Sequence, residues 1–90
     1  MTKLDAKFYG TVYKAKDDSE VPDDEWMVFL VKDSAFAPTL NFYRQKCVEF
    51  GCDAEHIAAV DRTIERLKAW RAANPHRLKI PDAAGERLLA

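Results

Sequence analysis

The sequence Phe50-Gly51-Cys52-Asp53 ends one predicted helix and begins another within a few residues. Glycine adopts the left-handed conformation that closes a helix without the steric penalty of a Cβ. Aspartate is a favoured N-cap, since its carboxylate accepts the free N–H groups of the first helical turn. A link this short predicts two antiparallel helices that form an αα-hairpin.

The two predicted helices cover about residues 38–50 and 54–74. Pro38 suits the first turn of a helix, where a missing N–H costs nothing, and Asn74-Pro75 forces the backbone out of helical geometry. On each helix the apolar residues recur at helical spacing, which predicts two facing stripes. The stripes are Leu40, Tyr43, Cys47 and Phe50 on the first helix, and Ile57, Val60, Ile64 and Leu67 on the second.

Upstream of the helices, two segments have the composition of β-strands. Residues 7–16 are rich in aromatic and β-branched side chains, which suit a half-buried strand. Six consecutive apolar residues from Trp26 to Val31 predict a more central strand over about 26–32, buried on both faces. The acidic stretch between these segments has the composition of a solvated loop. The two strands therefore predict a β-hairpin that precedes the helices in an α+β fold.

After the second helix, Leu78 and Ile80 alternate with Arg77 and Lys79. This alternation allows a third strand over 77–80 at the edge of the sheet. We expect one domain over residues 1–82, followed by a flexible tail over 83–90.

The composition is that of an ordinary folded domain, with 48% hydrophobic and 32% charged residues among 90. The N-terminus lacks the apolar stretch of a signal peptide, and no window approaches the roughly 18 apolar residues of a membrane span. The sequence therefore predicts a cytoplasmic protein without membrane association.

The segment from Trp26 to Pro38 combines an aromatic and aliphatic strand, Asp33, and an Ala37-Pro38 helix start. Together with the basic end Lys79-Ile80-Pro81-Asp82, it resembles small uncharacterised proteins of bacteriophages and bacterial genomes. The resemblance spans residues 26–82. It implies the same topology and a phage or prophage origin, and it supplies no activity and no site residue.

The residues that most often carry catalysis or bind metals form no pattern in this sequence. Cys47 and Cys52 are separated by four residues and lack the second cysteine pair or nearby histidines of a zinc site. We expect both to be small buried apolar residues. His56 falls in the first turn of a helix and His76 just beyond a helix end, with no reason in the sequence for them to meet. The sequence therefore predicts a non-enzymatic protein without a metal or cofactor.

An acidic run lies between the two predicted strands. It lacks the order of carboxylates and the distal glutamate of a calcium-binding EF-hand loop. A solvated loop is the simpler interpretation, and a docking patch for a basic partner is the alternative. The acidic residues are Asp17, Asp18, Glu20, Asp23, Asp24 and Glu25.

The link between the helices also has the small residue and turn glycine of a DNA-binding helix-turn-helix, at Cys47 and Gly51. The helix that would read DNA offers mainly alanines and acids to the groove, however, and acids repel phosphate. The length of this helix also favours a packed hairpin.

The basic stretch over residues 62–79 is the best functional candidate in the sequence. Arg62 and Arg66 fall opposite the apolar stripe of the second helix, with Trp70 at its margin. Arginine and tryptophan dominate the energetics of protein interfaces, and they can also hold phosphate and stack on bases. We expect a protein partner or self-association, with nucleic-acid binding as the alternative. The candidate residues are Arg62, Arg66, Trp70, Arg77 and Lys79.

Overall fold

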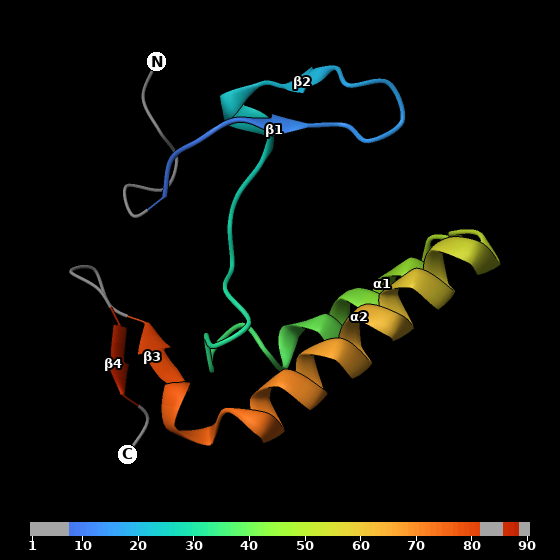
Figure 1. Cartoon of the computed structure of the whole chain (residues 1–90). Coiled ribbons are helices and arrows are strands. Elements are labelled where there is room, and N and C mark those ends of the chain that lie inside the picture. The colour runs from blue at the N-terminus through green and yellow to red at the C-terminus, as the bar shows by residue number, and fades with distance from the viewer. Residues whose placement is uncertain (1–7, 82–85, 89–90) are drawn as a thin grey trace.

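Two antiparallel helices form the largest part of the structure, α1 (Thr39–Glu49) and α2 (Ala54–Ala73). A β-hairpin precedes them in the chain and a second pair of short strands follows them, so the fold is α+β, as predicted (Figure 1). The computed structural model describes residues 8–81 and 86–88. Both helices lie within a residue or two of their predicted bounds.

The link between the helices has the predicted chemistry. Gly51 takes the left-handed conformation, with φ of 74°. The Cys52 N–H donates to the Cys47 carbonyl at 2.9 Å, which closes the end of α1. The Asp53 carboxylate accepts the N–H of His56 at 2.7 Å and so caps α2. These hydrogen bonds confirm the helical hairpin.

The core lies between α1 and α2 and is small. Cys47, Val60 and Ile64 form its centre, and Leu40, Cys52 and Ile57 pack against them. Leu67 is buried further along α2. The stripe on α2 is therefore confirmed. The stripe on α1 is only half right, because Tyr43 and Phe50 are exposed.

The hairpin consists of β1 (Val12–Tyr13) and β2 (Glu20–Val21), which pair antiparallel with Val12 opposite Val21. The chain turns much earlier than predicted. The Asp17 carboxylate accepts both the N–H and the hydroxyl of Ser19, at 3.0 and 2.6 Å, which is the local pattern that favours a tight turn. Pro22, which has no N–H, follows β2 directly, and a short 3₁₀ helix, η1 (Asp23–Glu25), comes next.

The predicted second strand over 26–32 is therefore wrong in position. Residues 26–30 form no strand or helix and lie between the hairpin and the helices (Figure 1). The expectation that both faces are buried is also wrong. Trp26, Val28 and Leu30 are half-buried, whereas Met27 and Phe29 are 65% and 53% exposed. Glu20 and Val21 pair with β1 in place of the apolar run, which therefore forms no strand pairing with the hairpin.

The last described strands are β3 (Lys79–Pro81) and β4 (Glu86–Leu88), which pair antiparallel in a separate two-stranded sheet. The predicted third strand is thus present, shifted along the chain, but it does not extend the hairpin. Part of the predicted tail forms β4, and residues 82–85 and 89–90 lie outside the described chain. A short 3₁₀ helix, η2 (Pro75–Arg77), joins α2 to β3.

Segment 31–34 is held between β3 and the end of α2. The Lys79 N–H donates to the Lys32 carbonyl at 2.9 Å, and the Lys79 carbonyl accepts a hydrogen bond from the Ser34 N–H at 2.9 Å. Arg71 donates to the Val31 carbonyl at 3.1 Å and to the Ser34 hydroxyl at 3.0 Å. The hairpin, by contrast, lies at the other end of residues 26–30, away from the helices (Figure 1).

Candidate interaction surface

The predicted basic residues do not form a single free strip. Arg62 and Arg66 are exposed on α2, as their positions on the helix predict. Trp70 is half-buried, and the guanidinium carbon of Arg77 lies 5.0 Å from the centre of its ring. At this distance the arginine and the indole form a cation–π contact. The tryptophan is therefore engaged by a residue of its own chain.

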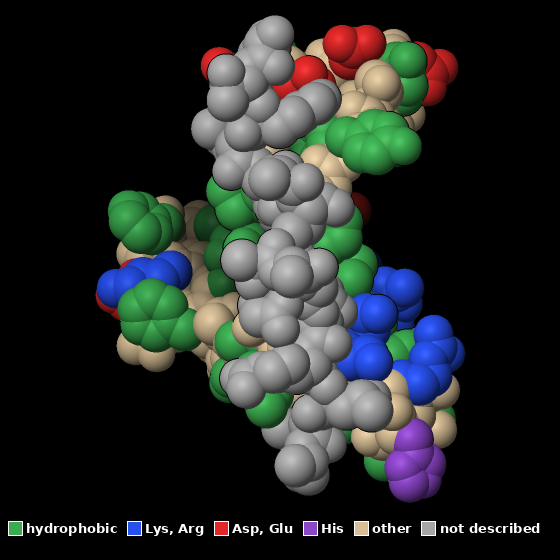
Figure 2. All heavy atoms as spheres, turned by 90° about the vertical axis from the view of Figure 1, so that its left-hand side faces the viewer, with side chains coloured by type: hydrophobic (Ala, Val, Ile, Leu, Met, Phe, Trp, Pro, Cys, Tyr) green, Lys and Arg blue, Asp and Glu red, His purple; other side chains and the backbone are tan. Residues whose placement is uncertain are grey.

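The acidic residues gather on the hairpin and η1. On the face drawn in Figure 2, acidic side chains lie at this end of the molecule, and Lys and Arg side chains lie below them. Asp17 belongs to the turn, because its carboxylate accepts hydrogen bonds from the hydroxyl and N–H of Ser19. These hydrogen bonds hold the pKa of the carboxyl below its ordinary value. The patch contains the predicted residues Asp17, Asp18, Glu20, Asp23, Asp24 and Glu25.

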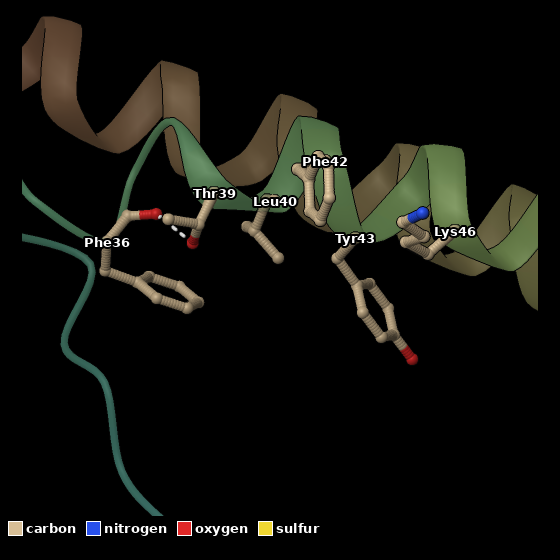
Figure 3. Close-up of a pocket in the computed structure, with 6 residues that line it drawn as sticks. All are labelled: Phe36, Thr39, Leu40, Phe42, Tyr43 and Lys46. Carbon is tan, nitrogen blue, oxygen red and sulfur yellow. Dashed lines mark hydrogen bonds between the residues drawn. The ribbon is translucent and has the colours of Figure 1, made fainter.

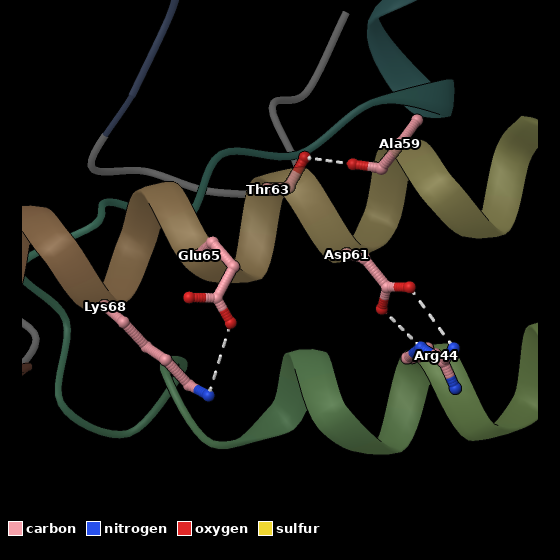
Figure 4. Close-up of polar contacts among 6 residues, drawn as sticks. All are labelled: Arg44, Ala59, Asp61, Thr63, Glu65 and Lys68. Atoms are coloured by element: carbon pink, nitrogen blue, oxygen red, sulfur yellow. Dashed lines mark hydrogen bonds and ion pairs between the residues drawn. The ribbon is translucent and has the colours of Figure 1, made fainter.

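A polar contact joins the two helices at the molecular surface. The guanidinium of Arg44 on α1 donates two hydrogen bonds to the carboxylate of Asp61 on α2 (Figure 4). These hydrogen bonds lower the pKa of Asp61 and raise that of Arg44. Further along α2, Lys68 lies 3.7 Å from Glu65, one turn away. This side of the helix pair is a conventional charged surface.

An aromatic surface covers α1 and the segment before it. We use the name aromatic face for Phe29, Phe36, Phe42 and Tyr43. The rings of Phe29 and Phe36 are stacked, 4.6 Å apart at an interplanar angle of 4°. Phe36, Phe42 and Tyr43 line a groove of about 490 Å³ together with Leu40, Thr39 and Lys46 (Figure 3). Phe42 and Tyr43 are 59% and 49% exposed.

The sequence pattern does not predict the aromatic face. It places Tyr43 in the core stripe of its helix and Phe29 in a strand buried on both faces. The available signal was an excess of apolar residues: α1 carries aromatic side chains on more of its circumference than one partner helix can cover. Phe50, next to the turn, is 84% exposed for the same reason.

A second group that the sequence pattern does not predict lies at the turn between the helices. One ligand atom each from Cys47, Cys52 and His56 all lie within 4.8 Å of one another. The Tyr43 hydroxyl is 3.2 Å from His56 Nε2. Hydrogen bonding with Cys47 raises the pKa of Tyr43, and partial burial raises the pKa of the Cys52 thiol. The expectation that no histidine stands near the cysteines is therefore wrong, because one turn of α2 brings His56 back over the link.

Comparisons with protein-family models, with curated proteins and with solved structures found no match to this chain. The resemblance to small phage proteins stays a prediction that depends on the quoted residues. Neither helix in the described part of the chain has both the length and the apolar character needed to cross a membrane.

Proposed function

We propose that this chain is a small non-catalytic module that associates with a second copy of itself through the aromatic face. The observation that carries the proposal is the contrast between a small core and large exposed rings. In the described part of the chain the buried apolar residues are Cys47, Val60, Ile64 and Leu67, whereas Phe29, Phe42 and Tyr43 of the aromatic face are 53%, 59% and 49% exposed. A second copy that covered these rings would supply the apolar contacts that one small core does not, as the interfaces of obligate homodimers do.

The chemistry of the exposed surface supports the same conclusion. Obligate interfaces are more apolar than ordinary surface, and large aromatic side chains contribute most of their binding energy. The aromatic face offers four such rings on adjoining elements, and Met27, two residues before Phe29, is also exposed. The formal net charge of −1 opposes the approach of two copies only weakly.

The test is the molar mass of the purified chain in solution, measured by sedimentation equilibrium over a dilution series. We expect a dimer for the wild-type chain and a monomer for the double variant Phe29→Ser, Phe42→Ser. Tyr9→Ser is the matched control, since Tyr9 is an 88% exposed aromatic residue outside the aromatic face, and this variant should remain dimeric. Circular dichroism confirms that each variant keeps its helices.

Two results would overturn the proposal. A wild-type chain that is monomeric at every concentration excludes self-association and leaves a different protein as the partner. A dimer that survives Phe29→Ser, Phe42→Ser but dissociates in Arg62→Ser, Arg66→Ser would place the interface on α2, where the sequence predicted it.

Nucleic-acid binding through residues 62–79 is the second candidate. The exposure of Arg62 and Arg66 favours it. It has less support than self-association, because Arg77 already contacts Trp70 and the chain as a whole is not basic. Binding of this kind weakens steeply with salt. If the chain does not change the electrophoretic mobility of DNA or RNA at low ionic strength, nucleic-acid binding is excluded.

A further inference from the structure

The turn between the helices brings two thiols and an imidazole to one point. Cys47 ends the core stripe of α1, Cys52 lies in the link, and His56 is in the first turn of α2. One ligand atom from each lies within 4.8 Å of the other two. We infer that Cys47, Cys52 and His56 form a site for a borderline-soft divalent metal ion, with Zn²⁺ as its natural occupant.

The backbone around the site is held by hydrogen bonds, so the convergence does not depend on free side-chain rotation alone. The Cys52 N–H donates to the Cys47 carbonyl, and the Phe50 N–H donates to the Lys46 carbonyl, both at 2.9 Å. The Asp53 carboxylate holds the backbone N–H of His56 at 2.7 Å. All three ligand-bearing residues are therefore placed by the capping structure of the helical hairpin.

The separations suit a tetrahedral ion after a small adjustment. Zinc–sulfur and zinc–nitrogen bonds of about 2.3 and 2.0 Å place two sulfur atoms roughly 3.8 Å apart, and a sulfur and a nitrogen roughly 3.5 Å apart. The three atoms need to approach by at most about 1.3 Å, which side-chain rotation of Cys52 and His56 can supply. Cys52 is only half-buried and His56 is exposed, so both have room to move.

The donor types decide the class of metal. Thiolate and imidazole ligands favour zinc and other late first-row ions, whereas magnesium and calcium need oxygen ligands. Three protein ligands leave the fourth position of a tetrahedron open to water or to a further side chain. The Tyr43 hydroxyl, 3.2 Å from His56 Nε2, can hydrogen-bond that nitrogen and so orient the imidazole.

The experiment uses the full chain, kept reduced so that both thiols remain available, and titrated with Co²⁺ as a spectroscopic substitute for zinc. We expect one ion per chain, an absorption band from thiolate-to-cobalt charge transfer, and loss of that band when Zn²⁺ is added. Native mass spectrometry counts the zinc retained.

The variants Cys52→Ser and His56→Gln should each weaken binding by at least about tenfold, since even residues that only support a metal ligand contribute 10- to 100-fold. Cys47 is left intact because it is 4% exposed and belongs to the core. His76→Gln is the matched control and should bind as the wild type does, since His76 lies beyond the far end of α2. Circular dichroism of each metal-free variant separates loss of binding from loss of folding.

Two outcomes would overturn the inference. The first is a reduced wild-type chain that shows no thiolate band and retains no zinc. The second is a pair of folded variants, Cys52→Ser and His56→Gln, that bind the ion as tightly as the wild type. Neither outcome bears on self-association, which is measured without added metal on variants that leave these three residues unchanged.

Discussion

Among single residues, Arg71 connects parts of the chain that lie far apart in the sequence. Its guanidinium donates to the Val31 carbonyl and to the Ser34 hydroxyl, so the end of α2 holds the segment that enters α1. Arginine suits this role because its planar donors can serve two acceptors at once. In the sequence, Arg71 looks like one more cation of the basic stretch, and its structural role becomes visible only in the fold.

Replacement of Arg71 by alanine should lower the free energy of unfolding by roughly 1–2 kcal/mol, because it leaves two partly buried acceptors without their donor. Urea denaturation followed by circular dichroism measures the change. Arg66→Ala, an exposed arginine of the same helix, should change it by less than about 0.5 kcal/mol. Equal losses in the two variants would show that Arg71 contributes only its helix propensity and charge.

The ion pair of Arg44 with Asp61 should make stability depend on pH in the acid range. Hydrogen bonding from Arg44 lowers the pKa of Asp61 in the folded chain. A carboxyl whose pKa is lower when folded stabilises the fold above its unfolded pKa of about 4, and this contribution is lost as the pH falls through the folded value. Stability should therefore decline below about pH 4.

Asp61→Asn should reduce stability at neutral pH and flatten the acid decline, and high salt should shrink the difference from wild type because the pair is at the surface. Thermal unfolding across an acid pH series measures this. Glu55→Gln removes an exposed negative charge from the same helix and serves as the control. An unchanged acid decline in Asp61→Asn would show that Asp61 is not coupled to folding.

Among the elements, the helical hairpin depends on one backbone conformation. Gly51 has φ of 74°, and a Cβ at this position would meet no atom within 4 Å. Gly51→Ala should therefore cost about 1 kcal/mol, entirely from the left-handed conformation rather than from a clash. Gly51→Asn should cost less, since asparagine tolerates this conformation better.

Chemical denaturation measures the free energy of unfolding of the three proteins. We expect it to decrease from the wild type to Gly51→Asn and then to Gly51→Ala. An alanine variant as stable as the wild type would mean that the link relaxes to another geometry. Because the same link positions Cys52 and His56, such a relaxed variant would also be expected to lose cobalt binding.

At the scale of the whole molecule, the described chain buries too little for its length. Cys47, Val60, Ile64 and Leu67 are its buried apolar residues, and large aromatic side chains remain at the surface. If a second copy covers the aromatic face, unfolding includes dissociation. The midpoint of thermal unfolding should then rise with protein concentration.

Differential scanning calorimetry over a wide dilution series measures this dependence. The variant Phe29→Ser, Phe42→Ser should unfold at a lower temperature that no longer changes with concentration, while Tyr9→Ser should retain the dependence. A wild-type midpoint that is independent of concentration would contradict a native dimer.

The two helices, their bounds and the link between them could be predicted from the sequence alone. These features follow from local signals: Pro38 at a helix start, Gly51 and Asp53 at the link, and Asn74-Pro75 at a helix end. The apolar stripe of α2 was equally clear, because helical periodicity needs no knowledge of the partner. The separate strand at Lys79–Pro81 was also close to its predicted place.

The positions of the apolar residues outside the small core depend on tertiary packing and could not be predicted in this way. The turn chemistry of Asp17 and Ser19 closes the hairpin before the run from Trp26 to Val31, so that run forms no strand. A composition that indicates burial says nothing about whether the covering surface belongs to the same chain. His56 follows Cys52 by four residues, about one helical turn, so their approach is local. That Cys47 joins them depends on the geometry of the link at Gly51, which the spacing alone does not show.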